Sequence, residues 1–393
     1  MRCAASVSSA SDVRHALPDL LAPIENRVTP GMVDLAFLFA TGHFEDELPQ
    51  IIERVAQVLP NALLIGCTAE GAIGADKELE RVPAMSLWAA AMPDVTIRPY
   101  YIRLEDLEPA TTVDRWERLV GASPESKPLF IALADPFRIP IHAFIDRINE
   151  FFPNAPLVGG IASAARRPEQ NRLFINGEIT REGIVGVSLT GPVRVHTVVS
   201  QGCRPIGKPF VITSGERNII HELGGRPALE QLHQVIASLP PEDEQLARQS
   251  LFVGRVINEY KEQFIRGDFL IHNIMGADRN RGAIGIAGQA RVGTTVQFHV
   301  RDAASADEDL RMMLKPYVDS DVRGALLFGC NGRGTHMWPE PGHDVGVLRE
   351  ILGDLPVAGF FCGGEFGPIG DKNFVHGFTA SIALFGEPVG SDQ

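Results

Sequence analysis

The sequence predicts an α/β (α+β) protein, in which repeated strand-helix-strand-strand units form layered mixed β-sheets with helices on the outer faces. The first observation behind this prediction is a short pattern that occurs three times. In each copy a large apolar residue and Pro precede an apolar run and a turn of small residues. The second observation is that each copy is flanked by apolar runs of strand length and by a segment of helical periodicity. The copies lie at residues 59–67, 152–160 and, as a weaker match, 355–363.

The elements of each copy follow from the spacing of its apolar residues. Buried strands are expected upstream of each Pro, at residues 35–40, 128–134 and 325–329. Helices are expected next, at 51–59, at 141–152 and, after a capping Asp344, up to 352. Further strands follow the turns, at 85–92, 95–103, 183–190, 193–200 and 377–385. A strand–helix–strand crossover pairs its strands in parallel and a hairpin pairs them antiparallel, so the sheets must be mixed.

The repeat is harder to follow between residues 204 and 322. Helices are expected at 227–239 and 307–314, and strands at 250–256, 268–272, 282–286 and 295–301. The stretch Leu239-Pro-Pro-Glu-Asp-Glu reads as a polar connection. The Gly224-Gly225 pair, ahead of a new helix, predicts the main domain boundary.

Charge and cysteine usage exclude several classes of partner. The net charge of −13 repels phosphate backbones and anionic lipid heads, so neither nucleic acid nor a membrane is an expected partner. The five cysteines are far apart and include no CxxC pair, which favours free thiols in a reducing compartment. Because the N-terminus lacks the long apolar core of a secretory signal, the expected location is the cytoplasm.

Four separated motifs resemble the FIST domain pair, named for F-box and intracellular signal transduction proteins. They are Ile65-Gly-Cys-Thr-Ala-Glu-Gly71, Cys330-Asn-Gly-Arg-Gly334, Ala358-Gly-Phe-Phe-Cys-Gly-Gly-Glu-Phe-Gly-Pro368 and His376-Gly-Phe-Thr-Ala-Ser-Ile-Ala383. The resemblance implies an N-terminal strand/helix extension, a FIST N-terminal domain, a FIST C-terminal domain and a tail. Their expected ranges are 1–29, 30–224, 225–386 and 387–393.

The resemblance implies an intracellular sensory module that binds a small polar ligand, such as an amino acid, and is not an enzyme. Bacterial FIST modules accompany chemoreceptor, histidine kinase and diguanylate cyclase parts, so a separate signalling protein of this kind is the expected partner. Some family members resemble haem-binding gas sensors. A nitric oxide sensor with non-covalent haem, ligated by His336 or His272, is therefore an alternative, and otherwise no cofactor or metal is expected. Gly363 stands where the family often carries a larger residue, so the ligand's identity does not transfer.

The candidate binding residues follow buried strands, where open α/β sheets tend to bind ligands. One group, Cys330, Asn331, Arg333 and Gly334, offers backbone N–H groups and a guanidinium to a carboxylate or other anion. Glu365 is placed to hold a ligand ammonium, or to pair with Arg333 when no ligand is present. The remaining candidates are Cys362, Gly363 and Gly364 before this acid, and Cys67, Thr68 and Glu70 in the first copy.

Each candidate also has a structural interpretation. The Cys330 loop is equally a turn in which Arg333 bonds local carbonyls, and the glycines also suit tight packing of the repeat. An enzyme with a Cys330 or Cys362 nucleophile, near His336 and His376 in the sequence, is a less favoured reading, because a buried free Cys more often acts as a small hydrophobe. A structural interaction protein is the remaining alternative.

Overall fold

The computed structural model describes residues 1–387, which form two compact units. Unit 1 comprises Met1–Val199, Leu310–Val375 and the described chain from Thr379, and unit 2 comprises Ser200–Asp309 and His376–Phe378. Of the expected tail, residues 388–393 lie outside the described residues. Over residues 1–387, no helix is both long and apolar enough to cross a membrane.

Three six-stranded mixed sheets of unit 1 share one plan. The centre of each sheet is a parallel pair of strands joined by a crossover helix. These segments are β2 (Leu35–Thr41), α2 (Leu48–Val58) and β3 (Leu63–Ala69); β8 (Leu129–Ala134), α5 (Ile141–Phe151) and β9 (Leu157–Ile161); and β21 (Val322–Cys330), α9 (His343–Leu352) and β22 (Val357–Cys362). The predicted mixed sheets are therefore confirmed, and so are the three predicted helix positions.

Two further strands extend each sheet on the side of the first parallel strand. The inner one pairs antiparallel with that strand in all three sheets. These inner strands are β6 (Met85–Ala91), β12 (Ile184–Thr190) and β25 (Thr379–Gly386), and the outer ones are β1 (Arg2–Ser8), β7 (Thr96–Ile102) and β13 (Arg194–Gln201). The expected N-terminal extension is thus part of the first sheet, because β1 pairs with β6 along its whole length.

Each sheet is completed by a hairpin that belongs to a different repeat. Hairpin β4–β5 (Gly71–Gly74 and Lys77–Glu80) follows β3 in the chain but pairs with β22. Hairpin β10–β11 (Leu173–Ile175 and Glu178–Thr180) follows β9 but pairs with β3. Hairpin β23–β24 (Glu365–Ile369 and Lys372–His376) follows β22 but pairs with β9. This cyclic exchange places residues of the first repeat beside the strands of the third.

Three glycines mark equivalent positions in the parallel pairs. Gly66, Gly159 and Gly359 are the register partners of Leu38, Ala132 and Leu327. A Cβ on them would lie 1.8, 1.9 and 1.7 Å from the partner's carbonyl oxygen. These glycines lie six residues after Pro60 and Pro153 but three after Pro356. Aligning the three copies by their Pro residues therefore misplaces the third copy by three residues. The structurally equivalent positions are the three glycines.

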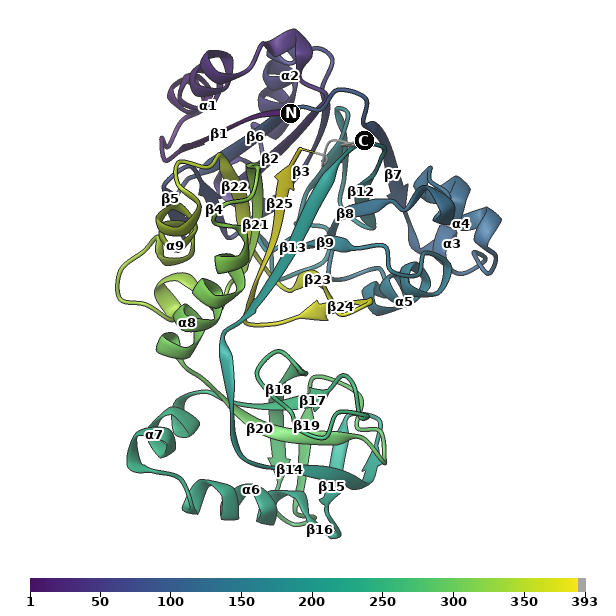
Figure 1. Ribbon diagram of the computed structural model, residues 1–393, viewed down its shortest axis with the longest axis vertical. Coiled ribbons are helices and arrows are strands. Elements are labelled where there is room, and N and C mark those ends of the chain that lie inside the picture. Colours follow the sequence, from purple (N-terminus) through teal and green to yellow (C-terminus); the bar gives the residue numbers. More distant parts are fainter. Residues whose placement is uncertain (388–393) are drawn as a thin grey trace. The chain divides into compact units, whose positions relative to one another are not determined.

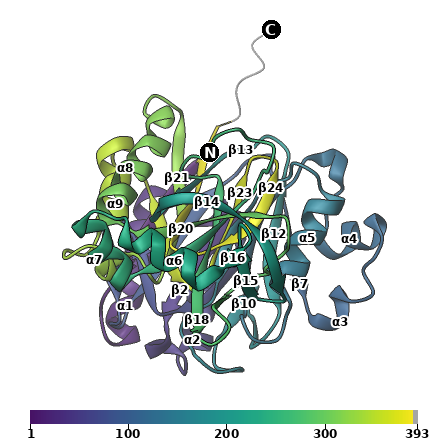
Figure 2. The same ribbon diagram turned by 90° about the horizontal axis from the view of Figure 1, so that it is seen from below.

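The inner faces of the three sheets share one apolar core, and helices cover the outer faces (Figures 1 and 2). Phe39 of the first sheet packs against Phe360 and Phe328 of the third, with ring centroids 4.8 and 6.3 Å apart. The outer layers contain α1 (Val13–Arg27) and α2 on the first sheet, α3 (Leu104–Leu107), α4 (Val113–Val120) and α5 on the second, and α9 with the end of α8 (Ala303–Leu314) on the third. The predicted layering is therefore confirmed.

Unit 2 is an antiparallel sheet that closes on itself. Its strand order is β14 (Cys203–Glu216), β20 (Thr295–Arg301), β17 (Leu251–Val256), β18 (Phe269–Asp278), β19 (Ala283–Ile286), β15 (Ile219–Leu223) and β16 (Arg226–Pro227). An additional pairing of β14 with β15 closes the first six strands of this order into a barrel, and β16 pairs with β15 alone. The expected boundary at Gly224-Gly225 is a turn between β15 and β16, with φ of 57° and 76°.

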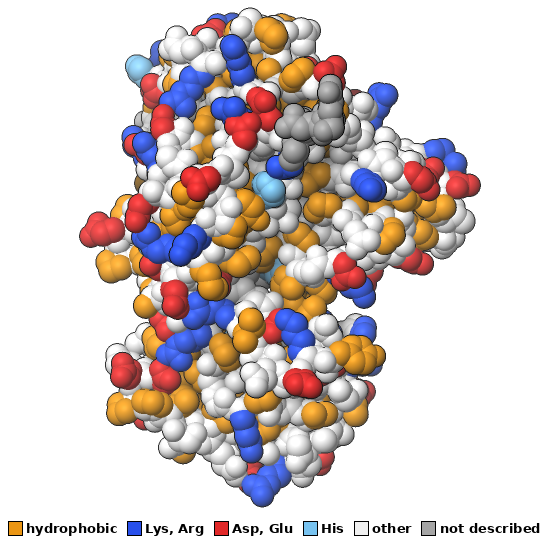
Figure 3. All heavy atoms as spheres, viewed as in Figure 1, with side chains coloured by type: hydrophobic (Ala, Val, Ile, Leu, Met, Phe, Trp, Pro, Cys, Tyr) orange, Lys and Arg blue, Asp and Glu red, His pale blue; other side chains and the backbone are white. Residues whose placement is uncertain are grey.

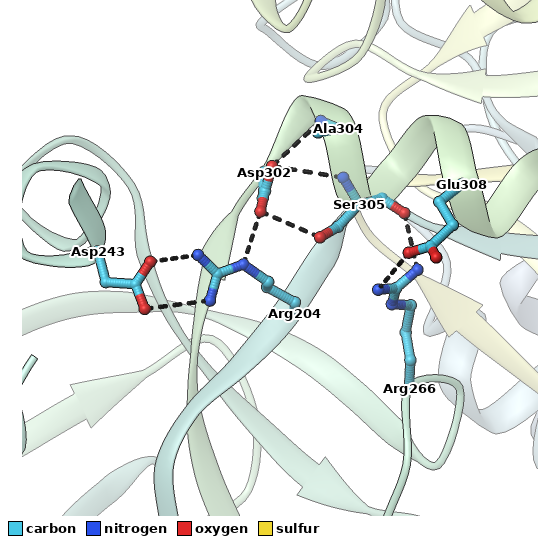
Figure 4. Close-up of polar contacts among 7 residues, drawn as sticks. All are labelled: Arg204, Asp243, Arg266, Asp302, Ala304, Ser305 and Glu308. Atoms are coloured by element: carbon cyan, nitrogen blue, oxygen red, sulfur yellow. Dashed lines mark hydrogen bonds and ion pairs between the residues drawn. The ribbon is translucent and has the colours of Figure 1, made fainter. Parts of the chain in front are cut away.

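Two helices of unit 2 follow β16 in the chain. The first, α6 (Ala228–Ala237), was expected, but the predicted polar connection after Leu239 is wrong, because α7 (Pro241–Gln249) begins there. Pro241 occupies the first helical position, where a missing N–H is not needed, and three acidic residues fill the first turn. Arg204 of β14 ties α7 to α8, since its guanidinium bonds both Asp243 and Asp302 (Figure 4). Asp302 in turn accepts hydrogen bonds from Ala304 N and Ser305 Oγ.

Candidate functional site

The centre of the candidate site is a buried ion pair beyond the carboxyl end of β21. Arg333 Nε donates to Asp344 Oδ2 at 2.6 Å and Nη2 donates to Oδ1 at 2.8 Å, and both residues are buried. Burial by itself would raise the pKa of Asp344, but the Arg333 guanidinium lowers it to about 2. The expected pairing of Arg333 with Glu365 is wrong, because Asp344 in the first turn of α9 takes two guanidinium N–H groups. Asp344 does not cap α9 with its side chain, since Gly342 is the N-cap residue.

The exchanged hairpin β4–β5 contributes two acidic side chains to this region. Glu78 is 4% exposed, and its Oε1 accepts from Val345 N at the start of α9, at 2.8 Å. Burial and then the negative charge of Asp344 raise the pKa of Glu78 to about 8. Glu80 accepts from Thr335 N at 2.8 Å and from Thr335 Oγ1 at 3.0 Å. The hairpin therefore holds both α9 and the loop after β21.

Glu365, at the start of β23, is fully buried. Its Oε2 accepts from Thr379 Oγ1 at 2.7 Å and from Thr379 N at 3.3 Å. Burial raises the pKa of Glu365 to about 8, and hydrogen bonds from Thr379 and from the Cys330 thiol oppose the rise. At pH 7 the side chain of Glu365 is therefore a neutral carboxyl. The carboxylate that was expected to hold a ligand ammonium is not the main form.

The residues Cys362, Gly363 and Gly364 have a structural role in the strand pairing. Gly363 N donates to Ile161 O and Ile161 N donates to Gly364 O, both at 2.9 Å. Cys362 is the register partner of Cys330 across the parallel pair β21–β22. Burial raises the pKa of the Cys362 thiol well above its ordinary value. The backbone contacts of Gly363 and Gly364 are therefore explained by close packing of the strands, without a ligand.

The first-copy candidates divide between the core and the surface of the site. Cys67 lies in the shared core, where burial raises the pKa of its thiol. Thr68 exchanges hydrogen bonds with Arg172, the residue before β10, with Thr68 Oγ1 accepting from Arg172 N at 2.8 Å. Glu70 N donates to Ser163 Oγ at 2.9 Å, and its side chain faces a hollow. Of the three, Glu70 alone is placed to meet a ligand there.

That hollow is narrow and lies beside the loop after β21. Its lining residues are Glu70, Gly71, Glu80, Arg81, Asn331, His336 and Phe361. The structure thus brings together Glu70 and Asn331, two candidates that are distant in the sequence. The space admits about one water molecule, which is far too little for a porphyrin beside His336. Gly334 borders this region with φ of 56°, and a Cβ there would lie 2.3 Å from Glu80 Oε1.

We call Glu70, Glu78, Glu80, Asn331, Arg333, Asp344 and Glu365 the strand-end site. Within residues 1–387, four buried atoms of this site have no nitrogen or oxygen hydrogen-bond partner. They are Arg333 Nη1, Glu78 Oε2, Glu365 Oε1 and Asn331 Oδ1. Leaving such a group unpaired costs about 1–3 kcal/mol of stability. The site therefore holds one donor and three oxygens with unused hydrogen-bonding capacity.

Sequence reasoning missed Glu78, Glu80 and Asp344 as members of this site. The alternation of Glu78 and Glu80 in Lys-Glu-Leu-Glu places both side chains on one face of a strand, and this was the available signal. Their meeting with Arg333 depends on the exchanged hairpin, which no local pattern indicates. The surface of unit 1 drawn in Figure 3 carries acidic and basic side chains interspersed.

Comparisons with solved structures find a cyanuric acid hydrolase from A. caulinodans, with 8% identity and a TM-score of 0.38, covering 98% of this chain and 100% of that one. A second cyanuric acid hydrolase structure has 10% identity and a TM-score of 0.33, covering 98% and 99%. Two sequence relatives are uncharacterized proteins. Rv0628c of Mycobacterium tuberculosis is 38% identical over 98% of this chain and 100% of its own length, and Mb0898c of Mycobacterium bovis is 36% identical over 98% and 99%.

Family models match nearly the whole chain in two adjoining segments. The FIST N domain matches residues 34–226 and the FIST C domain matches residues 228–368. The division between these two matches falls inside unit 2, so family domains and compact units have different boundaries. On the strength of these two matches, the chain belongs to the FIST family.

Proposed function

We propose that this FIST protein is a sensory module, which binds a small polar ligand at the strand-end site and signals through a separate partner protein. The observation that carries the proposal is the set of four buried, unpaired polar atoms on Arg333, Glu78, Glu365 and Asn331. Native proteins pair nearly all buried polar groups, and exceptions concentrate where a ligand or ordered water completes the bonding. Binding without covalent chemistry is sufficient to explain this arrangement.

The unpaired atoms also limit the chemistry of the ligand. Arg333 Nη1 donates, Asn331 Oδ1 accepts, and the neutral carboxyls of Glu78 and Glu365 can do either. A ligand with both donors and acceptors, such as an amino acid or a small hydroxy acid, matches this set. A simple anion at Arg333 fits less well, because Asp344 already neutralises the guanidinium.

Binding of such a ligand requires the wall of the hollow to move. The wall segment η5 (Gly334–His336) is held to hairpin β4–β5 by the two hydrogen bonds from Thr335 to Glu80. A ligand larger than water needs this segment to move outward, which changes the surface that a partner protein meets. The size of the change is limited by the difference in ligand affinity between the two states.

The test is a thermal-shift screen of the full chain against amino acids and small hydroxy acids at millimolar concentration. A ligand that binds only the folded state raises the melting temperature, so we expect a rise of a few degrees for at least one compound. The rise should disappear in Asn331→Leu and persist in Glu178→Gln, which alters an exposed residue of β11. Absence of a rise with every compound, or an equal rise in Asn331→Leu, would contradict the proposal.

A further inference from the structure

We propose that Cys330 and Cys362 form an oxidisable thiol pair, in which hydrogen peroxide oxidises Cys330, Glu365 moves the proton, and Cys362 closes a disulfide. This inference concerns a modification site and does not depend on the identity of the sensory ligand. It rests on the register of the two cysteines, on the position of the Glu365 carboxyl and on the size of the neighbouring hollow.

The two cysteines face each other at the carboxyl ends of β21 and β22. As register partners on parallel neighbours, their side chains point to the same face of the sheet. Adjacent strands lie about 4.8 Å apart, within the range of roughly 4.4–6.8 Å between Cα atoms that a disulfide spans. The Cys362 thiol packs against β9, where a Cβ on Gly160 would lie 2.4 Å from its Sγ. Gly160 therefore leaves room for this thiol.

The Glu365 carboxyl is positioned against both thiols. It receives a hydrogen bond from Cys330, and its negative form acts on the pKa of Cys362. Thr379 fixes Oε2, whereas Oε1 is fully buried without a nitrogen or oxygen partner in the described part of the chain. A carboxyl whose pKa burial raises to about 8 is suited to accept and return a proton near neutral pH.

The hollow suits a reagent of peroxide size. It is lined by Asn331, the residue after Cys330, and admits about one water molecule. Among the five buried cysteines, Cys3 and Cys330 share the largest exposed fraction, 9%, and Cys362 is at 0%. Cys3 lies in the shared inner core, and a Cβ on Gly324 would lie 2.9 Å from its Sγ. Cys330 is the more exposed cysteine of the pair and its neighbour Asn331 lines the hollow, so we assign the first reaction with the oxidant to Cys330.

The chemistry balances in two steps. The first step starts from the ionised form of Glu365, which is the minority form at pH 7 because the pKa of this group is about 8. The Cys330 thiol passes its proton to that carboxylate, the sulfur attacks one oxygen of hydrogen peroxide, and the O–O bond breaks. The departing hydroxide takes the proton from Glu365, which gives Cys330 sulfenic acid and one water. In the second, the Cys362 sulfur attacks Cys330 Sγ, and the sulfenic oxygen leaves as water with the Cys362 proton. Two thiols are oxidised to one disulfide, and one hydrogen peroxide is reduced to two waters.

The experiment treats the reduced full chain with stoichiometric hydrogen peroxide, followed by denaturation, alkylation and tryptic mass spectrometry. We expect a disulfide joining peptide 324–333 to peptide 350–372, each of which holds a single cysteine. Cys362→Ser should stop at a Cys330 sulfenic acid that dimedone traps. Glu365→Gln should slow disulfide formation about tenfold or more. Cys203→Ser, a buried cysteine of unit 2, should leave the rate unchanged.

Three results would overturn the inference. One is a chain that keeps all five thiols under excess peroxide. Another is a Cys67–Cys362 disulfide in place of Cys330–Cys362, because Cys67 also acts on the pKa of the Cys362 thiol. The third is equal oxidation of wild type and Glu365→Gln, which would remove the proton-transfer role. Circular dichroism of each variant separates these results from a failure to fold.

Discussion

Arg333 and Asp344 form a two-bond ion pair inside unit 1, with N–O distances of 2.6 and 2.8 Å and almost no exposure of either side chain. The guanidinium also lies over the Trp338 ring, 5.1 Å from its centroid. The pair joins the loop after β21 to the first turn of α9. It therefore fixes the wall of the strand-end site from within the protein.

Breaking this pair should destabilise the protein strongly. Arg333→Met leaves Asp344 as a buried, unpaired charge, and Asp344→Leu does the same to Arg333, so each should lower the free energy of unfolding by about 3–5 kcal/mol. The double variant Arg333→Met/Asp344→Leu should recover most of that loss. Urea unfolding measures all three. As a control, Arg323→Met breaks a half-exposed pair with Asp321 and should cost no more than about 1 kcal/mol. An equal loss of stability in Arg333→Met and Arg323→Met would argue against a buried pair at Arg333.

Glu365→Gln should stabilise the protein increasingly as pH rises. The pKa of Glu365 in the folded state is raised to about 8 from an ordinary value near 4.5, so between these values the folded state holds a proton that the unfolded state has lost. This group therefore reduces stability as pH rises from about 5 to 8. The stability difference between Glu365→Gln and wild type should grow by roughly 2–4 kcal/mol over that interval. A difference that is constant with pH would show that Glu365 titrates normally.

The equivalent glycines of the parallel pairs should not tolerate alanine. In Gly159→Ala the new Cβ would lie 1.9 Å from the backbone oxygen of Ala132, which a side-chain rotation cannot relieve. We expect a loss of about 3 kcal/mol or more, and the same for Gly66→Ala and Gly359→Ala. Gly346→Ala in α9 has open space and should stabilise by up to about 1 kcal/mol. Thermal unfolding of the four variants checks that the three glycines are equivalent. A small loss of stability in Gly359→Ala, with large losses in the other two, would contradict the register assigned to the third copy.

Arg204 should be required for the attachment of α7 in unit 2. Its half-buried guanidinium bonds Asp243 of α7 and Asp302 before α8, so Arg204→Ala removes two ion pairs at once. We expect a loss of about 1–3 kcal/mol and faster hydrogen exchange in α7. Arg248→Ala, which removes an exposed pair with Glu244 inside α7, should cost no more than about 0.5 kcal/mol. Equal exchange in the two variants would show that Arg204 does not hold this helix.

Local patterns were sufficient to predict the repeated part of the fold. The apolar spacing of residues 141–152 and the run at 128–134 specify α5 and β8, because both depend on the burial of one face or of a whole strand. The register of the third copy was not predictable from Pro356. It depends on the contact of Gly359 with the Leu327 carbonyl, which the chain makes only after folding.

The candidate site was predicted in part. Asn331, Arg333, Glu70 and Glu365 lie in the region that the strand ends indicated, but the partner of Arg333 was missed. Asp344 lies on the next helix, and the sequence alone gives no reason to prefer it over Glu365. Glu78 and Glu80 arrive by the exchange of hairpin β4–β5. Such an exchange depends on tertiary packing among three sheets, for which a single sequence holds no local signal.

The most direct test of the strand-end site is amide hydrogen exchange across residues 330–338 and 78–81, with and without a compound that raises the melting temperature. The account predicts that the compound changes exchange in both segments together, because Glu80 joins them through Thr335. It also predicts no such change in Asn331→Leu. A compound that stabilises the protein while leaving exchange in both segments unchanged would place the ligand elsewhere and contradict the account.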